Sequence, residues 1–111
     1  MNYKVLPTPR FKTQVKKLKK KFPLIDDELR DFEQSLSKNA AQGADLGNKT
    51  FRNKIATKSI GKGNGGGARV ITYIIKEDFE IYLLTIYDRP EVSTVTDKAV
   101  EAMVREVEKI V

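Results

Sequence analysis

The chain has 111 residues, a net charge of +6 at pH 7, and neither cysteine nor histidine. This length fits one modest hydrophobic core, so we expect a single domain over residues 1–111. The composition excludes disulfide bonds, zinc sites built on cysteine, and histidine as a general base or metal ligand; we expect no metal and no small-molecule cofactor. No apolar run is long enough for a membrane span or a signal peptide, which predicts a cytoplasmic protein without a membrane partner.

The N-terminal part of the chain predicts a short strand followed by two helices. Residues 2–8 favour an edge strand. Thr8 and Pro9 are typical of a helix start, as the N-cap and the first helical residue. Apolar residues then recur at helical spacing up to the next proline, and again over residues 24–38, so we expect a helical hairpin. The stretch 39–48 has no period and is expected to be a loop.

After this loop the spacing of apolar residues changes from helical to alternating. Residues 50–58, 68–76 and 79–87 are rich in β-branched or aromatic side chains and predict an antiparallel β-meander. Residues 96–111 return to helical spacing, with Thr96 as a candidate cap. The order β-α-α-β-β-β-α predicts an α+β domain: an N-terminal strand and helical hairpin packed as one helical layer on the meander, with a C-terminal helix.

Positive charge is concentrated in two segments of the chain. Residues 1–22 carry eight Lys or Arg and no Asp or Glu, and residues 46–76 carry seven, again without an acid. The acids collect over residues 26–33 and 77–108. Such segregation predicts one strongly positive side of the molecule, which attracts nucleic acid or an acidic protein partner.

The predicted strand at 50–58 lies at the centre of this positive charge. Alternation places Arg52, Lys54 and Lys58 on one side of it, about 7 Å apart per two-residue step. Like charges at that spacing repel one another unless they are solvated or neutralised. The row is therefore either a platform for a polyanion or the solvated outer face of a sheet.

A glycine-rich stretch, GKGNGGG at 61–67, connects this strand to the next. Its spacing matches GxGxxG, but a strand follows it where a dinucleotide site needs a helix, and no P-loop lysine opens a helix either. We expect a flexible hairpin connection that lets a bulky ligand approach, or a turn without a function. Arg69 follows directly, and its planar donor group suits phosphate.

The last predicted strand ends in IYDR, residues 86–89. Tyr87 is in phase with Phe79, Ile81 and Leu83, which places it at the edge of the core with its hydroxyl exposed. Arg89 is either a site residue or an ordinary surface charge. The first helix carries lysines on its polar faces, and these are either a solvated surface or contacts to a nucleic acid.

Together these segments resemble the RelE/ParE superfamily of bacterial toxins, and most of all its RelE/HigB branch. The resemblance spans nearly the whole chain and is most specific at Gly-Gly-Ala-Arg-Val-Ile, residues 66–71, and at Ile-Tyr-Asp-Arg, residues 86–89. It implies a RelE-like fold and a ribosome-dependent mRNA endoribonuclease, a translation-inhibiting enzyme that needs no metal. It also implies two partners, the mRNA in the ribosomal A site and a cognate antitoxin protein.

The resemblance implies catalytic roles for Lys54, Arg69, Tyr87 and Arg89. RNA or ribosome contacts are then expected from Arg52, Lys58, Lys62, Lys16 and Lys20. Crowding among cations favours an uncharged lysine, so that Lys54 could accept a proton, although the sequence offers more than one strand lysine for this role. Two other functions stay open: DNA gyrase inhibition, as in ParE-like proteins of the same fold, and a non-catalytic basic RNA-binding module.

Overall fold

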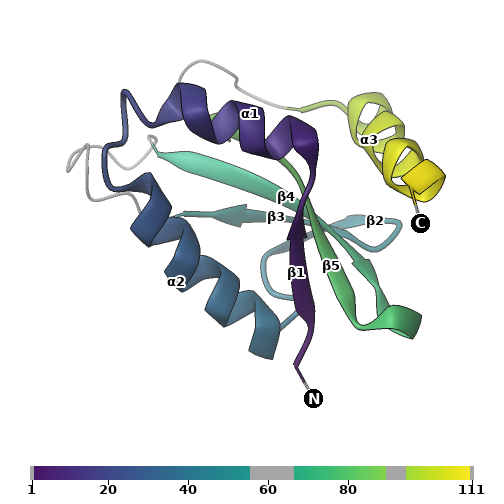
Figure 1. The fold of residues 1–111 in the computed structure, drawn as a ribbon. Helices are drawn as coiled ribbons and strands as arrows, with labels where there is room; N and C mark the ends of the chain where they lie inside the picture. The colour runs from purple at the N-terminus through teal and green to yellow at the C-terminus, as the bar shows by residue number, and fades with distance from the viewer. Residues whose placement is uncertain (1, 56–66, 90–94, 111) are drawn as a thin grey trace.

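The computed structural model describes residues 2–55, 67–89 and 95–110 (Figure 1). Its strands are β1 (Lys4–Pro7), β2 (Ala44–Gly47), β3 (Thr50–Lys54), β4 (Ala68–Ile75) and β5 (Glu80–Asp88). Its helices are α1 (Pro9–Leu18), α2 (Ile25–Lys38), the short 3₁₀ turn η1 (Lys76–Asp78) and α3 (Asp97–Ile110). This is the α+β class that the sequence predicts. None of the helices in the described ranges has the length and apolar character needed to cross a bilayer.

The five strands form one mixed sheet in the order β1-β5-β4-β3-β2. β1 runs parallel to β5, whereas β2, β3, β4 and β5 pair antiparallel. The predicted antiparallel meander is thus confirmed for β3, β4 and β5, and the N-terminal strand joins it in parallel. Residues 56–58 of the first predicted meander strand lie outside the described residues. Alternation within a strand indicates which residues share a face but not which distant strand becomes the neighbour.

The predicted loop at 39–48 is wrong in part, because it contains β2. This strand has four residues, is mostly exposed, and pairs only with β3. A two-residue hairpin connects the two strands through Asn48 and Lys49, both at positive φ, the backbone that the tight hairpin turns require. The backbone N–H of Gly47 also donates to the Asp45 carboxylate at 2.7 Å. So short an exposed edge strand shows no alternation from which it could be predicted.

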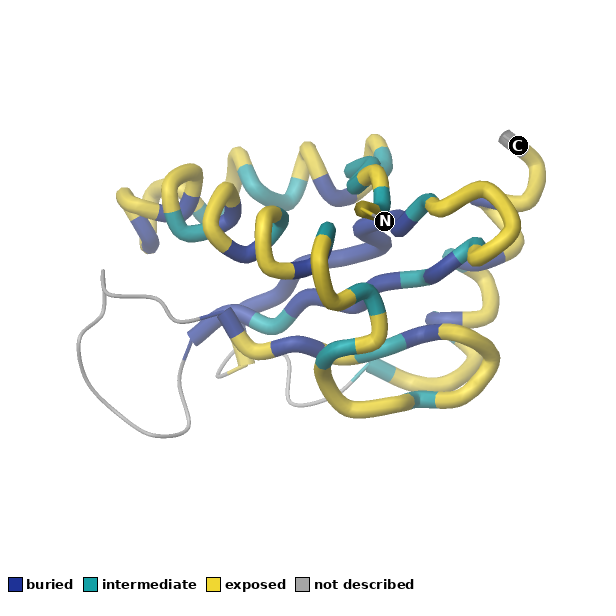
Figure 2. Tube along the Cα trace, turned by 90° about the horizontal axis from the view of Figure 1, so that it is seen from below, coloured by how far each residue is buried: buried dark blue, intermediate teal, exposed yellow. Residues whose placement is uncertain are grey.

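Helices cover both faces of the sheet: the helical hairpin forms one layer, as predicted, and α3, for which the sequence predicted no face, covers the other. One face packs against α1 and α2 through a cluster that includes Phe11, Ile25 and Leu36. The opposite face packs against α3 through Val100, Val104 and Val107. Buried residues follow the strands and the inner sides of the helices (Figure 2). A buried apolar stripe identifies a helix, but the stripe does not say which face of the sheet it covers.

The predicted helix caps are confirmed. The Thr8 hydroxyl accepts a hydrogen bond from the Phe11 N–H at 3.3 Å, with Pro9 as the first residue of α1. The Thr96 hydroxyl accepts one from the Ala99 N–H at 3.2 Å ahead of α3. Each cap satisfies one of the N–H groups that the first turn of a helix leaves without an intrahelical partner.

A β-bulge interrupts the pairing of β5 with β4. Leu83 lies opposite Thr72, but Thr85 lies opposite the preceding residue of β4, Ile71. Leu84 is therefore an extra residue in β5. One extra residue reverses the alternation of every side chain that follows it.

The bulge decides the face on which Tyr87 lies. Ile81 and Leu83 pack in the cluster under α1 and α2, and after the bulge Ile86 does so as well. Tyr87 consequently packs in the other cluster, under α3. The prediction that Tyr87 is in phase with Ile81 and Leu83 is wrong, because it assumed an unbroken strand.

Candidate active site

Three neighbouring strands bring Lys54, Arg69 and Tyr87 into one row across the sheet. Lys54 in β3 is the Cα partner of Arg69 in β4, and Arg69 is the partner of Tyr87 in β5. Partners in adjacent antiparallel strands have Cβ atoms about 5 Å apart on the same face. Residues from three separate segments of the sequence therefore meet on the face that carries α3.

Around Arg69 this face is hollowed by about 190 Å³, and the hollow is lined by Arg52, Arg69, Tyr87 and Arg89. Arg52 and Arg69 come from adjacent strands, and Tyr87 and Arg89 from the end of β5. Among the described residues, no acidic side chain contributes to this lining. We call these four residues the arginine hollow. Its lining offers three planar N–H donor groups and one aromatic ring.

The backbone of Gly67, just before β4, is hydrogen-bonded to the backbone just after β5. Its φ of +102° lies in the left-handed region, which costs glycine little. Its carbonyl accepts a hydrogen bond from the backbone N–H of Arg89 at 3.2 Å and a longer one from Arg69 Nη1 at 3.4 Å. The last glycine of the glycine-rich stretch thus fixes the backbone beside two of the three arginines.

Tyr87 is both a core residue and a wall of the hollow. Only 8% of its surface is exposed, because its ring packs in the cluster that includes Val100 and Val104 of α3. A ring held in this way has few conformations open to it, so it presents a fixed surface to the hollow.

The acid that lies between Tyr87 and Arg89 in the sequence does not reach the hollow. The Asp88 side chain is fully buried on the other face of the sheet, where its carboxylate pairs with the ammonium of Lys21. Buried charges in proteins are normally paired in this manner. The pairing removes from the site the one carboxylate that the IYDR motif brings close to it.

Further along the same face of the sheet the charge is negative. This acidic end lies four residues from Arg69, about 13 Å along β4. There burial raises the pKa of Tyr73, and the carboxylates of Glu108 and Glu77 raise it further. Tyr73 is the cross-strand partner of Tyr82, whose pKa is also raised by burial and by Glu80. The positive end and the acidic end of this face are thus distinct.

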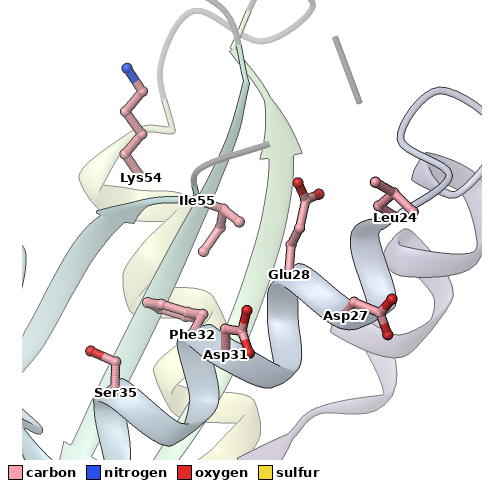
Figure 3. Close-up of a pocket in the computed structure, with 8 residues that line it drawn as sticks. All are labelled: Leu24, Asp27, Glu28, Asp31, Phe32, Ser35, Lys54 and Ile55. Carbon is pink, nitrogen blue, oxygen red and sulfur yellow. The ribbon is translucent and has the colours of Figure 1, made fainter. Parts of the chain in front are cut away.

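Lys54 lies in the row but does not line the arginine hollow. It borders instead a larger hollow of about 490 Å³ between β3 and α2, with Asp27, Glu28 and Asp31 on the helix side. In Figure 3 the Lys54 ammonium points away from these carboxylates. Lys54 is exposed, and its backbone is paired with that of Arg69.

The other residues predicted for RNA contact do not join the hollow. Lys16 in α1 and Lys20 just after it are exposed on the helical layer that covers the opposite face of the sheet. Lys58 and Lys62 lie outside the described residues. Within the ranges that are described, no cluster of three or more His, Cys, Asp or Glu could hold a metal ion.

Contacts from α1 to the end of β5 were missed by the sequence analysis. Gln14 and Thr8 hydrogen-bond to the bulged part of β5, and Lys21 pairs with Asp88. These contacts depend on the bulge and on which helix covers which face, and no local pattern in the sequence indicates either.

Comparison with known proteins identifies the fold. No model of a known protein family matches the sequence. Among solved structures, the chain is similar to the E. coli toxin RelE, seen as a double arginine-to-alanine mutant in the free state. The TM-score is 0.60 with 12% sequence identity, over 96% of this chain and 99% of that chain. The chain has a RelE-like fold, as the sequence predicts; a closer relation to HigB stays a prediction.

Proposed function

We propose that this protein is a ribosome-dependent mRNA endoribonuclease, a translation-inhibiting toxin that a cognate antitoxin protein neutralises. The observation that carries the proposal is the arginine hollow: three guanidinium groups and one tyrosine, with no acid among its described lining residues, on a RelE-like fold. Such a cluster is unfavourable by itself, because like charges repel, and favourable around a phosphate.

RNA cleavage without a metal needs three contributions. The 2′-hydroxyl must lose a proton as it attacks the phosphorus, the pentacoordinate phosphorane must be stabilised, and the leaving 5′-oxygen must gain a proton. The products are a 2′,3′-cyclic phosphate and a free 5′-hydroxyl, so no water is consumed in this step.

In this proposal Arg69 binds the scissile phosphate, because it lies at the centre of the row and at the wall of the hollow. Arg52 and Arg89 approach the same hollow from either side and stabilise the added negative charge of the phosphorane. Tyr87 orients the sugar or stacks on a base, an interaction worth about 1–3 kcal/mol.

Lys54 is the proposed proton acceptor. It is the Cα partner of Arg69 yet lies outside the hollow, so it can approach the 2′-hydroxyl beside the phosphate that Arg69 holds. A ribosome that aligns the message in its A site would contribute much of the remaining barrier reduction, about 7–11 kcal/mol for positioning alone.

Lys16, Lys20, Lys58 and Lys62 are the proposed wider contacts to ribosomal RNA or to an acidic antitoxin segment. Long-range attraction between a basic surface and RNA is screened by salt, so association should weaken as salt rises. Acting on ribosomes places the protein in the cytoplasm.

Primer extension on a model message, with and without purified ribosomes, tests the proposal. We expect cleavage only with ribosomes, its loss in Arg69→Ala, and its retention in Arg30→Ala. Arg30 is a matched control because it is an exposed arginine on α2 that pairs with Asp27 and does not line the arginine hollow. Intact message with a block of DNA supercoiling would identify a gyrase inhibitor instead. Intact message with salt-sensitive ribosome binding would identify a non-catalytic RNA-binding module.

A further inference from the structure

We propose that Gln14 is a positioning residue for the active site: its side-chain carbonyl holds the bulge of β5 in the register that turns Tyr87 toward Arg69. The inference rests on the proposed function for its catalytic readout. Its structural content, the face on which Tyr87 lies, can be measured whether or not the protein cleaves RNA.

β1 covers only the first part of the outer edge of β5. β1 pairs with β5 from Lys4 to Pro7, so beyond Leu83 no strand among the described residues lies beside the outer edge of β5. Side chains of α1 take over this edge. The Thr8 hydroxyl donates to the Leu83 carbonyl at 2.9 Å and more weakly to the Leu84 carbonyl at 3.3 Å, and the Thr8 N–H donates to the Leu83 carbonyl at 3.1 Å.

Gln14 contacts the residues of β5 just after the bulge. Its Oε1 accepts from the Thr85 hydroxyl at 2.9 Å and from the Ile86 backbone N–H at 3.0 Å. Thr85 is 3% exposed and Ile86 is 1% exposed, so neither donor can turn to bulk water. Buried donors without an acceptor are strongly unfavourable. One oxygen on α1 therefore satisfies two donors at the point where β5 has its extra residue.

The register of β5 against β4 decides on which face of the sheet Tyr87 lies. In an unbroken strand Tyr87 would share a face with Leu83, and both would lie in the cluster under α1 and α2. The extra Leu84 reverses this, so that Tyr87 becomes the cross-strand partner of Arg69 and lines the arginine hollow. Gln14 acts from the opposite side of the sheet, through Ile86, and touches no substrate.

The test compares three variants with the wild-type protein. Gln14→Leu keeps the shape of the side chain and removes the acceptor. Gln14→Glu keeps an acceptor oxygen at the same reach. Gln34→Leu is the matched control, since Gln34 is an exposed glutamine on α2. We would measure kcat and KM on programmed ribosomes, and the nuclear Overhauser contact between the Tyr87 ring and the Arg69 side chain.

We expect Gln14→Leu to lose this contact and to lower kcat about 100-fold with KM nearly unchanged, as a misplacement near 1 Å does. Gln14→Glu and Gln34→Leu should keep both the contact and the rate. A Gln14→Leu protein that retains the contact, or retains kcat, overturns the proposal. So does a Gln14→Glu protein that fails to recover the rate.

Two further outcomes would change how the experiment is evaluated: a Gln14→Leu variant that does not fold, and a wild-type protein that is inactive. If Gln14→Leu does not fold, Gln14→Asn replaces it, because the shorter amide stays polar but falls short of both donors; the same outcomes then apply. If the wild-type protein cuts no ribosome-bound message, the proposed function fails. The inference about Gln14 is then decided by the Tyr87–Arg69 contact alone, whose persistence in the variant overturns it.

Discussion

Gly43 offers a sharp test of how β2 and β3 are held at the edge of the sheet. It has a φ of +100°, and a Cβ atom added there would lie 2.6 Å from the Arg52 carbonyl oxygen and 2.7 Å from Asn53 Nδ2. Real Cβ atoms do not approach other atoms so closely. Gly47 is the matched control, because its φ is +87° but its added Cβ would meet no atom within 4 Å.

The two positions separate backbone strain from close approach. Alanine at positive φ costs roughly 1–2 kcal/mol, and both variants should lose this amount of folding free energy. Gly43→Ala must in addition displace either the Arg52 carbonyl, which is strand backbone, or the Asn53 side chain. Asn53 is 6% exposed and donates to the Gln42 carbonyl at 3.2 Å. Loss of a buried hydrogen bond of this kind costs about 1–3 kcal/mol.

We therefore expect Gly43→Ala to be about 2 kcal/mol less stable than Gly47→Ala. Urea unfolding followed by circular dichroism measures this difference, and the corresponding difference in melting temperature is roughly 8 °C. Equal losses in the two variants would refute the close approach, and with it the view that the loop before β2 supports the strand that carries Arg52. A larger loss in Gly47→Ala would refute it as well.

Three other changes probe the site and its supports. Lys54→Ala should lower kcat on programmed ribosomes more than ribosome affinity, whereas Arg69→Ala should abolish cleavage; equal losses of rate and affinity in Lys54→Ala would make it a phosphate anchor. Lys21→Met should destabilise the fold by about 1–3 kcal/mol in urea unfolding, because it leaves the buried Asp88 carboxylate without its cation, and the added change Asp88→Asn should recover part of the loss. Burial raises the pKa of Glu33 above its ordinary value of 4.5, so its proton binds more tightly in the folded state; that stabilisation is present below pH 4.5 and is lost as the pH rises through the folded-state pKa. Glu33→Gln should then raise the unfolding midpoint at pH 7 but not at pH 4, and an equal effect at both values would contradict the assignment to burial.

Local patterns in the sequence predict most of the elements of this fold. Helical spacing gives α1, α2 and α3, and the hydroxyls of Thr8 and Thr96 give the starts of the first and the last. Alternation gives β3, β4 and β5. What these patterns lack is information about distant partners. The parallel pairing of β1 with β5 and the position of α3 on the opposite face are decided by tertiary packing, to which single residues contribute weakly.

The candidate active site, too, is predicted by local patterns only in part. Alternation within β3 places Arg52 and Lys54 on one side of that strand, and the pairing of β3 with β4 then adds Arg69 to them. It fails for Tyr87, because the bulge at Leu84 intervenes and no glycine in β5 marks it. The resemblance to RelE toxins nevertheless grouped Tyr87 with Arg69, and the structure brings them together. The resemblance thus groups two residues that lie together because of a bulge, which alternation does not detect.

In the proposed cleavage reaction, the charge of the arginine hollow determines which state along the reaction it stabilises most. At about 7 Å apart and an effective dielectric constant near 20, two guanidinium groups repel by roughly 2 kcal/mol before salt screening. A phosphodiester brings one negative charge into the hollow, and the phosphorane brings approximately two. At about 4 Å from a cation, the added charge gains roughly 4 kcal/mol under the same conditions. Because Arg52, Arg69 and Arg89 all line the hollow, this gain is shared among them and is larger for the phosphorane than for the bound substrate. Selective stabilisation of the more highly charged state is what catalysis requires. In the proposed mechanism, the three guanidinium groups therefore promote cleavage while the Asp88 carboxylate stays paired with Lys21 on the far face of the sheet.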